Sequence, residues 1–262
     1  MFHRAELKKQ AKQAMQGNWT QILLTVGLLA IINTSLNIVS ANSDNLNLGD
    51  LLLLLLDGPL MISFNIFMLH LLRHKTVHIQ QFFDGFSNFI KWMLAGLWQT
   101  LWLTLWTLLF VIPGMVKFFS YSQYYFILAD NPDADLRQAL KTSMKMTNGY
   151  KGDLFVAYLS FLNWGLLFFA GYFAAAMLFW PNDPHWLVGA VVTIPLYLYV
   201  MPYMTGTFAG IYEELKVTAL VNDVCSPEEF GLDEVPHTST FITAATEPQD
   251  DSSIYYDDDE QL

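Results

Sequence analysis

The stretch from Asn88 to Asp130 contains more apolar chain than a single membrane-spanning helix can use. Its 43 residues would form a helix roughly 64 Å long, about twice the hydrocarbon thickness of a bilayer. The stretch therefore has to fold back on itself. Pro113-Gly114 is its strongest helix-breaking signal, because proline removes a backbone donor and glycine permits a tight turn. We predict two antiparallel membrane helices joined at Pro113-Gly114.

Apolar segments of this kind recur along the chain and indicate an integral membrane protein. The chain is 53% hydrophobic and 14% charged, whereas a soluble domain carries about 25% charged residues. Each segment is close to the roughly 20 residues that a spanning helix needs. The six predicted segments are 20–40, 49–72, 89–111, 114–130, 153–180 and 186–212. We therefore predict an all-α, polytopic membrane protein with about six transmembrane helices.

The distribution of lysine and arginine predicts the orientation of these helices. With the N-terminus in the cytoplasm, 12 of the 13 basic residues fall on the cytoplasmic side. The external connections 41–48 and 181–185 contain none. This pattern follows the positive-inside rule. It predicts a multi-pass protein of the cell membrane with both termini in the cytoplasm, and Lys117 is the one exception.

Short polar stretches precede the first, third and fifth apolar segments, and each of them contains a glycine near its end. We interpret the chain as three copies of one unit, an interfacial helix followed by a helical hairpin. The alternative is chance similarity, because every membrane hairpin needs polar flanks. The three stretches are LKKQAKQAMQGNW (7–19), VHIQQFFDGFSNF (77–89) and ALKTSMKMTNGYKGDLF (139–155).

A few polar residues inside the predicted spans form a candidate intramembrane site between the second and fourth spans. Asp57 interrupts a run of leucines, and Lys117 lies at a similar predicted depth. Unpaired charges are expensive in a membrane, so one hypothesis is an Asp57–Lys117 ion pair. The alternative is that the Lys117 ammonium reaches the outer interface along its own helix. Tyr121 and Gln123 complete the candidate site.

Tryptophans and histidines also recur at helical spacing. Trp98, Trp102 and Trp106 form a stripe, and it either packs against a neighbouring helix or lipid or lines a site for an apolar ligand. His70, His74 and His78 would share a face of a continuous helix, as metal ligands can. Arg73 and Lys75 lie among these histidines and disfavour a bound cation. We predict no metal site.

The C-terminal residues 217–262 differ in kind from the rest of the chain. They contain 12 acidic residues and no lysine or arginine, whereas residues 1–216 have a formal charge of +1. We predict a membrane domain at 1–216 and a disordered acidic cytoplasmic tail at 217–262. The tail is either a solvated spacer or a partner-binding segment with Tyr255 and Tyr256 as anchors. Because the acidity belongs to the tail and the body is nearly neutral, nucleic-acid binding has no support.

Sequence motifs of common enzymes are absent. The chain has no P-loop, HExxH, GxSxG or CxxC sequence and no pair of intramembrane carboxylates. Cys225 is the single cysteine, which excludes an internal disulfide framework. We predict a non-enzymatic protein without cofactors.

Several motifs resemble a bacterial family of integral membrane proteins known as domain of unknown function 975. They are GNW near the first span, a predicted turn at DGP, the FFDGF stretch and the long stretch LLFVIPGMVKFFSYSQYYFILADNPDADLRQALKTSMKMTNGYKGDLF. The resemblance covers roughly residues 1 to 215. The chain is also similar, more distantly, to the membrane domain that precedes some glycerophosphodiester phosphodiesterases. The resemblance implies a polytopic cell-membrane protein and implies no activity or catalytic residues.

Two functions are consistent with these features, and a third, a membrane enzyme acting on lipid headgroups, is disfavoured by the missing motifs. The leading one is a protein that binds or moves a membrane lipid or other amphiphile, or assists a transport or envelope system. The polar fourth span, the tryptophan stripe and the interfacial helices favour it. The alternative is an assembly partner that recruits a cytoplasmic protein through the acidic tail.

Overall fold

The computed structural model describes residues 4–41, 48–74, 76–179 and 185–233. Within these ranges every regular element is helical, which confirms the predicted all-α class there. The elements are α1 (Arg4–Met15), α2 (Trp19–Ala41), α3 (Leu48–His74), α4 (Gln80–Asp84), α5 (Phe89–Leu109), α6 (Val111–Tyr121), α7 (Tyr124–Asp130), α8 (Leu136–Met146), α9 (Lys151–Leu159), α10 (Leu162–Phe179), α11 (His185–Val221) and the 3-10 helix η1 (Pro227–Phe230).

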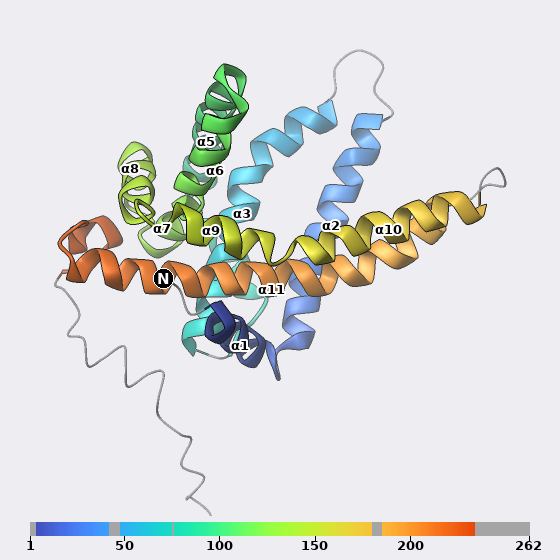
Figure 1. The fold of residues 1–262 in the computed structure, drawn as a ribbon, viewed down its shortest axis with the longest axis horizontal. Coiled ribbons are helices and arrows are strands. Elements are labelled where there is room, and N and C mark those ends of the chain that lie inside the picture. The colour runs from blue at the N-terminus through green and yellow to red at the C-terminus, as the bar shows by residue number, and fades with distance from the viewer. Residues whose placement is uncertain (1–3, 42–47, 75, 180–184, 234–262) are drawn as a thin grey trace, which may run out of the picture.

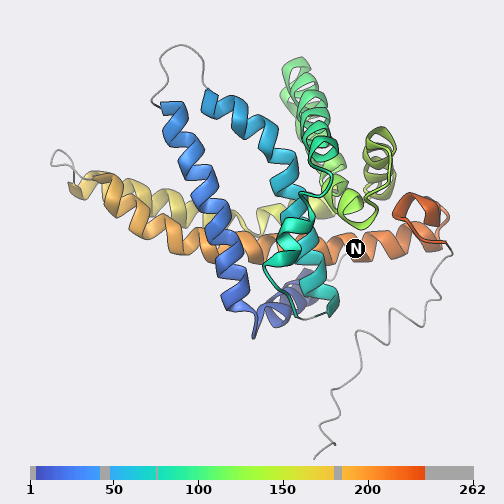
Figure 2. The same ribbon diagram turned by 180° about the vertical axis from the view of Figure 1, so that it is seen from behind.

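The chain forms three helical hairpins, and α3, which belongs to the first, contacts α2, α5, α7 and α11. The α2–α3 and α5–α6 hairpins extend to the same side of the molecule (Figure 1). The α10–α11 pair crosses them at a steep angle, as both views show (Figure 2). The 37 residues of α11 make a helix about 55 Å long, and it contacts α1, α2, α3 and α8.

Three stretches of the described helices are long and apolar enough to cross a membrane. They are Trp19–Leu36, Gly49–His74 and Lys151–Gly171. The first two coincide with predicted spans one and two, and the third covers α9 and the first half of α10. The membrane class is therefore supported by fewer helices than the six predicted from the sequence.

The middle hairpin turns earlier than predicted. Phe110, with extended backbone angles (φ −158°, ψ 141°), separates α5 from α6, and Pro113 and Gly114 lie in the first turn of α6. Gly114 serves close packing, because a Cβ there would lie 2.6 Å from Thr107 Oγ1. The predicted helix 114–130 is also interrupted, since α6 ends at Tyr121 and α7 begins at Tyr124.

The DGP motif, Asp57-Gly58-Pro59, was predicted as a turn, but it lies inside α3. Gly58 is required by a close helix crossing, because a Cβ there would lie 2.0 Å from the Trp92 carbonyl oxygen of α5. Gly96 of α5 faces it, and its Cβ would lie 2.7 Å from the Gly58 nitrogen. The two glycines thus let α3 and α5 touch backbone to backbone.

A short helix precedes each hairpin, as the three-unit interpretation expects. These helices are α1, α4 and α8. Gly17 and Gly149, which follow α1 and α8, both adopt left-handed angles (φ 87° and 88°). Helix α1 packs on α11 where Gly206 and Gly210 leave room, since a Cβ at Gly210 would lie 3.2 Å from Leu7 Cδ2. The GxxxG sequence therefore serves packing within the chain.

The predicted start of the disordered tail at residue 217 is wrong for the residues that the structure describes. Helix α11 continues to Val221, and η1 follows at Pro227–Phe230. Cys225 and Phe230 are buried, and the ring of Phe230 lies 5.4 Å from Lys216 Nζ. Burial of these two side chains anchors the segment despite its acidic composition. The remaining tail, 234–262, lies outside the described residues.

Candidate functional site

A buried group of charged side chains joins the ends of three helices. Arg73 at the end of α3 donates to Asp130 at the end of α7 (Nη1–Oδ1 2.7 Å). Arg73 also pairs with Glu213 of α11 (Nη2–Oε1 2.6 Å). The second carboxylate oxygen of Asp130 accepts from Lys216 and from the Tyr212 hydroxyl, the latter at 2.9 Å. We call these five residues the ionic cluster.

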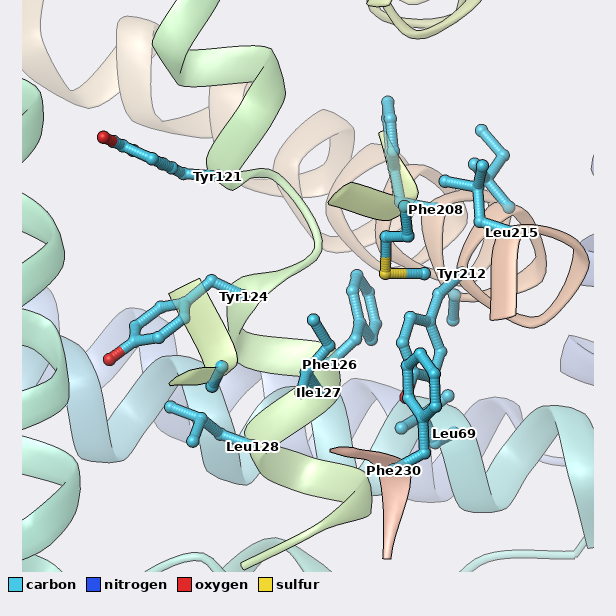
Figure 3. Packing of buried hydrophobic residues seen from close by; sticks show 14 of the residues in the cluster. Leu69, Tyr121, Tyr124, Phe126, Ile127, Leu128, Phe208, Tyr212, Leu215 and Phe230 are labelled. Atoms are coloured by element: carbon cyan, nitrogen blue, oxygen red, sulfur yellow. The ribbon is translucent and has the colours of Figure 1, made fainter. Parts of the chain in front are cut away.

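The ionic cluster is a structural element rather than an open site. The side chains of Lys216 and Asp130 are 6% and 8% exposed. Charges this far from water are tolerated only when opposite charges and hydrogen bonds compensate them, which they do here. Figure 3 shows Tyr212 beside Phe126 and Phe230, and its ring stacks on Phe126 at 5.6 Å.

Sequence reasoning missed the ionic cluster. It counted Arg73 and Lys216 only as basic residues on the cytoplasmic side. A usable signal was present, because Asp130 lies in the stretch ILADNP at the end of an apolar run. A carboxylate at such a place needs a cationic partner.

The structure does not bring Asp57 and Lys117 together. The Asp57 carboxylate accepts a hydrogen bond from the Tyr125 hydroxyl of α7 at 3.3 Å. Tyr125 was not among the predicted site residues. Its hydroxyl also lies 3.7 Å from the position of a Cβ on Gly96, which places Asp57 at the α3–α5–α7 crossing. The predicted Asp57–Lys117 ion pair is therefore replaced by an Asp57–Tyr125 hydrogen bond.

Lys117 lies in a separate, aromatic environment. Its ammonium is 4.8 Å from the centre of the Trp106 ring and 5.9 Å from that of Tyr121. Its ammonium also donates to the Met144 sulfur of α8, at 3.6 Å. No carboxylate pairs with Lys117 among the residues that the structure describes.

Tyr121 and Gln123 are buried at the joint between α6 and α7. The Gln123 amide donates to the Ser122 hydroxyl at 3.1 Å, whereas its carbonyl oxygen has no partner in the described part of the chain. The hydroxyls of Tyr121 and Tyr124 point away from the cluster around Phe126 and Tyr212 (Figure 3). The four predicted residues thus divide into Asp57 at one crossing and the other three around α6.

A groove of about 320 Å³ lies between α5 and the start of α8. Its volume is near the lower end of the range for ligand pockets, roughly 300–1,000 Å³. Its lining is mainly leucine and tryptophan, with one cationic and one acidic residue. The lining residues are Leu94, Leu97, Trp98, Leu101, Asp135, Leu136 and Arg137. We call it the α5–α8 groove.

The α5–α8 groove carries a cation at one edge. The Arg137 guanidinium carbon lies 5.2 Å from the centre of the Trp98 ring, within the range of a cation–π contact. Arg137 forms no ion pair with any described carboxylate. Asp135 lines the same groove, but its Oδ2 accepts from the backbone N–H groups of Arg137 and Gln138 at 3.1 Å each, capping α8.

The packed C-terminal segment holds an ion pair at the other end of α8. Glu229 Oε1 accepts from Lys145 Nζ and from Gln138 Nε2, each at 2.7 Å. Burial by itself would raise the pKa of Glu229, but the hydrogen bond and charge of Lys145 lower it overall. Burial, together with the charge of Glu229, raises the pKa of the Cys225 thiol to about 12. This thiol is therefore a poor nucleophile at neutral pH.

The histidines do not share one helical face as the spacing suggested. His70 and His74 lie edge to face at 5.7 Å, but α3 ends at His74 and His78 follows outside the helix. The described residues contain no group of three or more side chains that could hold a metal ion.

Comparison with known proteins identifies a family and leaves the activity open. No curated protein and no solved structure matches the chain. The similarity to the phosphodiesterase membrane domain therefore stays a prediction. A family described as "Protein of unknown function (DUF975)" matches residues 1–121 and again residues 110–219. These matches cover most of the sequence, and the chain belongs to the DUF975 family.

Proposed function

We propose that this protein is a non-enzymatic, multi-pass protein of the cell membrane that binds an anionic membrane lipid in the α5–α8 groove. The observation that carries the proposal is the combination of an apolar floor with Arg137, a cation stacked on Trp98. The one carboxylate in the lining, Asp135, accepts from backbone N–H groups and caps α8. An acyl chain matches the leucine floor, and a phosphate matches the guanidinium. Moving a lipid, or assisting a transport or envelope system, would build on this binding.

The position of the groove along α5 supports a lipid rather than a water-soluble ligand. Lys91, one turn before Leu94, donates to the Pro132 carbonyl oxygen in the α7–α8 connection. The groove thus begins beside a polar loop and continues along apolar turns of α5, with Leu101 59% exposed. This order, polar at one end and apolar along its length, fits a lipid at a membrane interface.

The arrangement of helix ends supports a common cytoplasmic side for the three hairpins. Arg73, Asp130 and Lys216 meet in the ionic cluster, although they come from three different hairpins. The positive-inside rule assigned Arg73 and Lys216 to the cytoplasmic side, and Asp130 pairs with both of them. We therefore retain six membrane-inserted segments, with both termini in the cytoplasm, as part of the proposal.

The direct test is binding of phosphatidylglycerol to the full chain, measured by native mass spectrometry from mild detergent. We expect Arg137→Gln to weaken binding by roughly tenfold, the cost of one partly exposed charged contact of about 1.4 kcal/mol. Lys141→Gln is the matched control, because it removes an exposed cation one turn along the same helix. Equal losses in both variants would indicate non-specific charge attraction and contradict the proposal.

A second candidate is recruitment of a basic cytoplasmic protein by the acidic tail. Its support is the contrast between 12 acidic residues and no basic ones in 217–262. The structure sharpens the test, because residues 217–233 pack against the body. A truncation after Asp233 keeps that packing and removes only the remainder. Loss of a co-purifying protein, with lipid binding intact, would favour this second function.

A further inference from the structure

The tip of the α5–α6 hairpin is the most exposed apolar feature among the described residues. Five consecutive side chains around the turn are between 62% and 82% exposed. They are Leu108, Leu109, Phe110, Val111 and Ile112. Between Thr107 and Lys117 the chain has no polar side chain. An apolar patch of this kind would be unfavourable in water.

The other two hairpins have sequences of the opposite character at their tips. ANSDNLNL at 41–48 and PNDPH at 181–185 are rich in polar and charged residues. Such sequences suit a segment that reaches water beyond the membrane. The middle hairpin reverses direction through FVIPG instead. The sequence at the tip thus sets this hairpin apart from the other two.

Several hydrogen bonds reduce the number of unpaired polar groups at the turn. The Phe110 N–H donates to Trp106 O at 3.2 Å, and the Gly114 N–H donates to Phe110 O at 3.1 Å. The Thr107 hydroxyl donates to Leu103 O at 2.8 Å. Only Phe110 separates the two helices, and Pro113 in the first turn of α6 has no N–H that could be left unpaired. Each of these features lowers the cost of placing the turn in hydrocarbon, where an unsatisfied group is costly.

The direction of Lys117 agrees with a tip that lies away from water. A lysine so close to an external turn would be expected to extend toward that turn and the water beyond it. Its ammonium instead lies 3.6 Å from the Met144 sulfur of α8 and 4.8 Å from the centre of the Trp106 ring of α5. Helix α8 carries basic residues that the positive-inside rule places in the cytoplasm. The Lys117 ammonium therefore lies against neighbouring helices and does not extend beyond the tip of the hairpin.

We infer that the α5–α6 hairpin ends inside the hydrocarbon layer and does not emerge into water on the far side. Its binding partner is the acyl-chain region of the bilayer. From Lys91 to Phe110 the helix rises about 28 Å, and α6 returns only about 16 Å before its break, so the hairpin reaches the far edge of a hydrocarbon core of roughly 30 Å at most. The middle hairpin is then embedded in the membrane and does not supply two complete crossings.

The test places single cysteines in the full chain, with Cys225 changed to Ala. Ile112→Cys and Leu108→Cys report the two sides of the turn, and Ser43→Cys reports a polar hairpin tip. Right-side-out and inside-out vesicles are treated with a membrane-impermeant maleimide. We expect both tip cysteines to react at least about tenfold more slowly than Ser43→Cys reacts from its accessible side, because a thiolate is disfavoured in hydrocarbon.

A second measurement separates embedding in lipid from shielding by protein. A small fluorophore on Ile112→Cys is quenched by lipids that carry a nitroxide on the acyl chain or on the headgroup. We expect the acyl-chain nitroxide to quench more strongly. Labelling at the rate of Ser43→Cys from either side, or stronger headgroup quenching, would overturn the inference. Labelling of Ser43→Cys from the cytoplasmic side would overturn only the proposed orientation, so the two failures are distinguishable.

Discussion

The ionic cluster and the two cations packed on α5, Arg137 and Lys117, differ in whether a carboxylate compensates the positive charge. In the cluster, Arg73 and Lys216 each contact a carboxylate, and the carboxylate of Asp130 is shared between them. Arg137 and Lys117 instead lie over the rings of tryptophans of α5, and no described carboxylate pairs with either of them. The positive charges of the cluster are compensated by carboxylates of the same chain, whereas Arg137 and Lys117 can bind an anion from outside the chain.

This difference separates residues that hold the fold from residues that can bind. Buried charges are costly, so a compensated cluster fixes the positions of the helix ends that it joins. For cations beside aromatic rings at a partly exposed groove, the absence of a ligand has only a small free-energy cost. Substitutions in the two regions should therefore have different consequences, stability in the first and binding in the second.

The largest expected effect is on stability, from Asp130→Asn in the ionic cluster. The substitution removes the negative charge that Arg73 and Lys216 share, and it leaves Lys216 buried without a carboxylate. Removing one partner of a buried ion pair costs about 3–5 kcal/mol. Thermal unfolding in detergent measures the loss. Asp133→Asn, an exposed carboxylate in the following loop, should change stability by less than about 0.5 kcal/mol. Similar losses in both variants would contradict a specific role of the ionic cluster in stability.

A smaller loss is expected from Gly58→Ala at the α3–α5 crossing. The new methyl group would lie 2.0 Å from the Trp92 carbonyl oxygen, so the two helices must move apart. Overpacking of this kind costs about 1–3 kcal/mol, and unfolding measurements report it directly. Gly27→Ala in α2 is the control, because a Cβ there meets nothing within 4 Å. A stable Gly58→Ala variant would show that the backbone contact is dispensable.

The smallest expected effect concerns pH and the Lys145–Glu229 pair. The pKa of Glu229 is below its usual value of 4.5, so the pair contributes stability above pH 4.5 and loses it as pH falls through the lowered pKa. Lys145 is 46% exposed, which limits the contribution to about 0.2–1 kcal/mol. We expect Lys145→Gln to be less stable than the wild type at pH 7, and this difference to shrink as pH falls through the lowered pKa of Glu229. A difference that is independent of pH below 4.5 would contradict the assignment to this pair.

The parts of the fold that sequence reasoning predicted depend on neighbours along the chain. The apolar segments predicted helices α2 and α3, and the impossible length of 88–130 predicted a hairpin there. The turn was placed three residues late, because Gly114 is needed for contact with Thr107 and not for the reversal itself. The same cause explains Gly58, a close-packing residue that was interpreted as part of a turn.

The candidate site was predicted less well, because its contacts join distant parts of the chain. Asp57 was given the wrong partner, since depth along a helix does not say which face a side chain occupies. Tyr125 lies 68 positions away from it, and only the crossing of α3, α5 and α7 makes them neighbours. The ionic cluster spans 140 positions from Arg73 to Glu213 and was missed for the same reason.

The sequence by itself determined the helical class, the membrane character of the chain, the folding back of its middle segment and its family. These properties follow from local spacing, from the length of the apolar segments and from the distribution of charge. All three are features of the linear sequence. The tertiary structure alone decided which charges are compensated, where the α5–α8 groove forms and how residues 217–233 are anchored. Those outcomes depend on how helices cross, and a crossing is set by side-chain and backbone contacts between segments that the chain order keeps far apart.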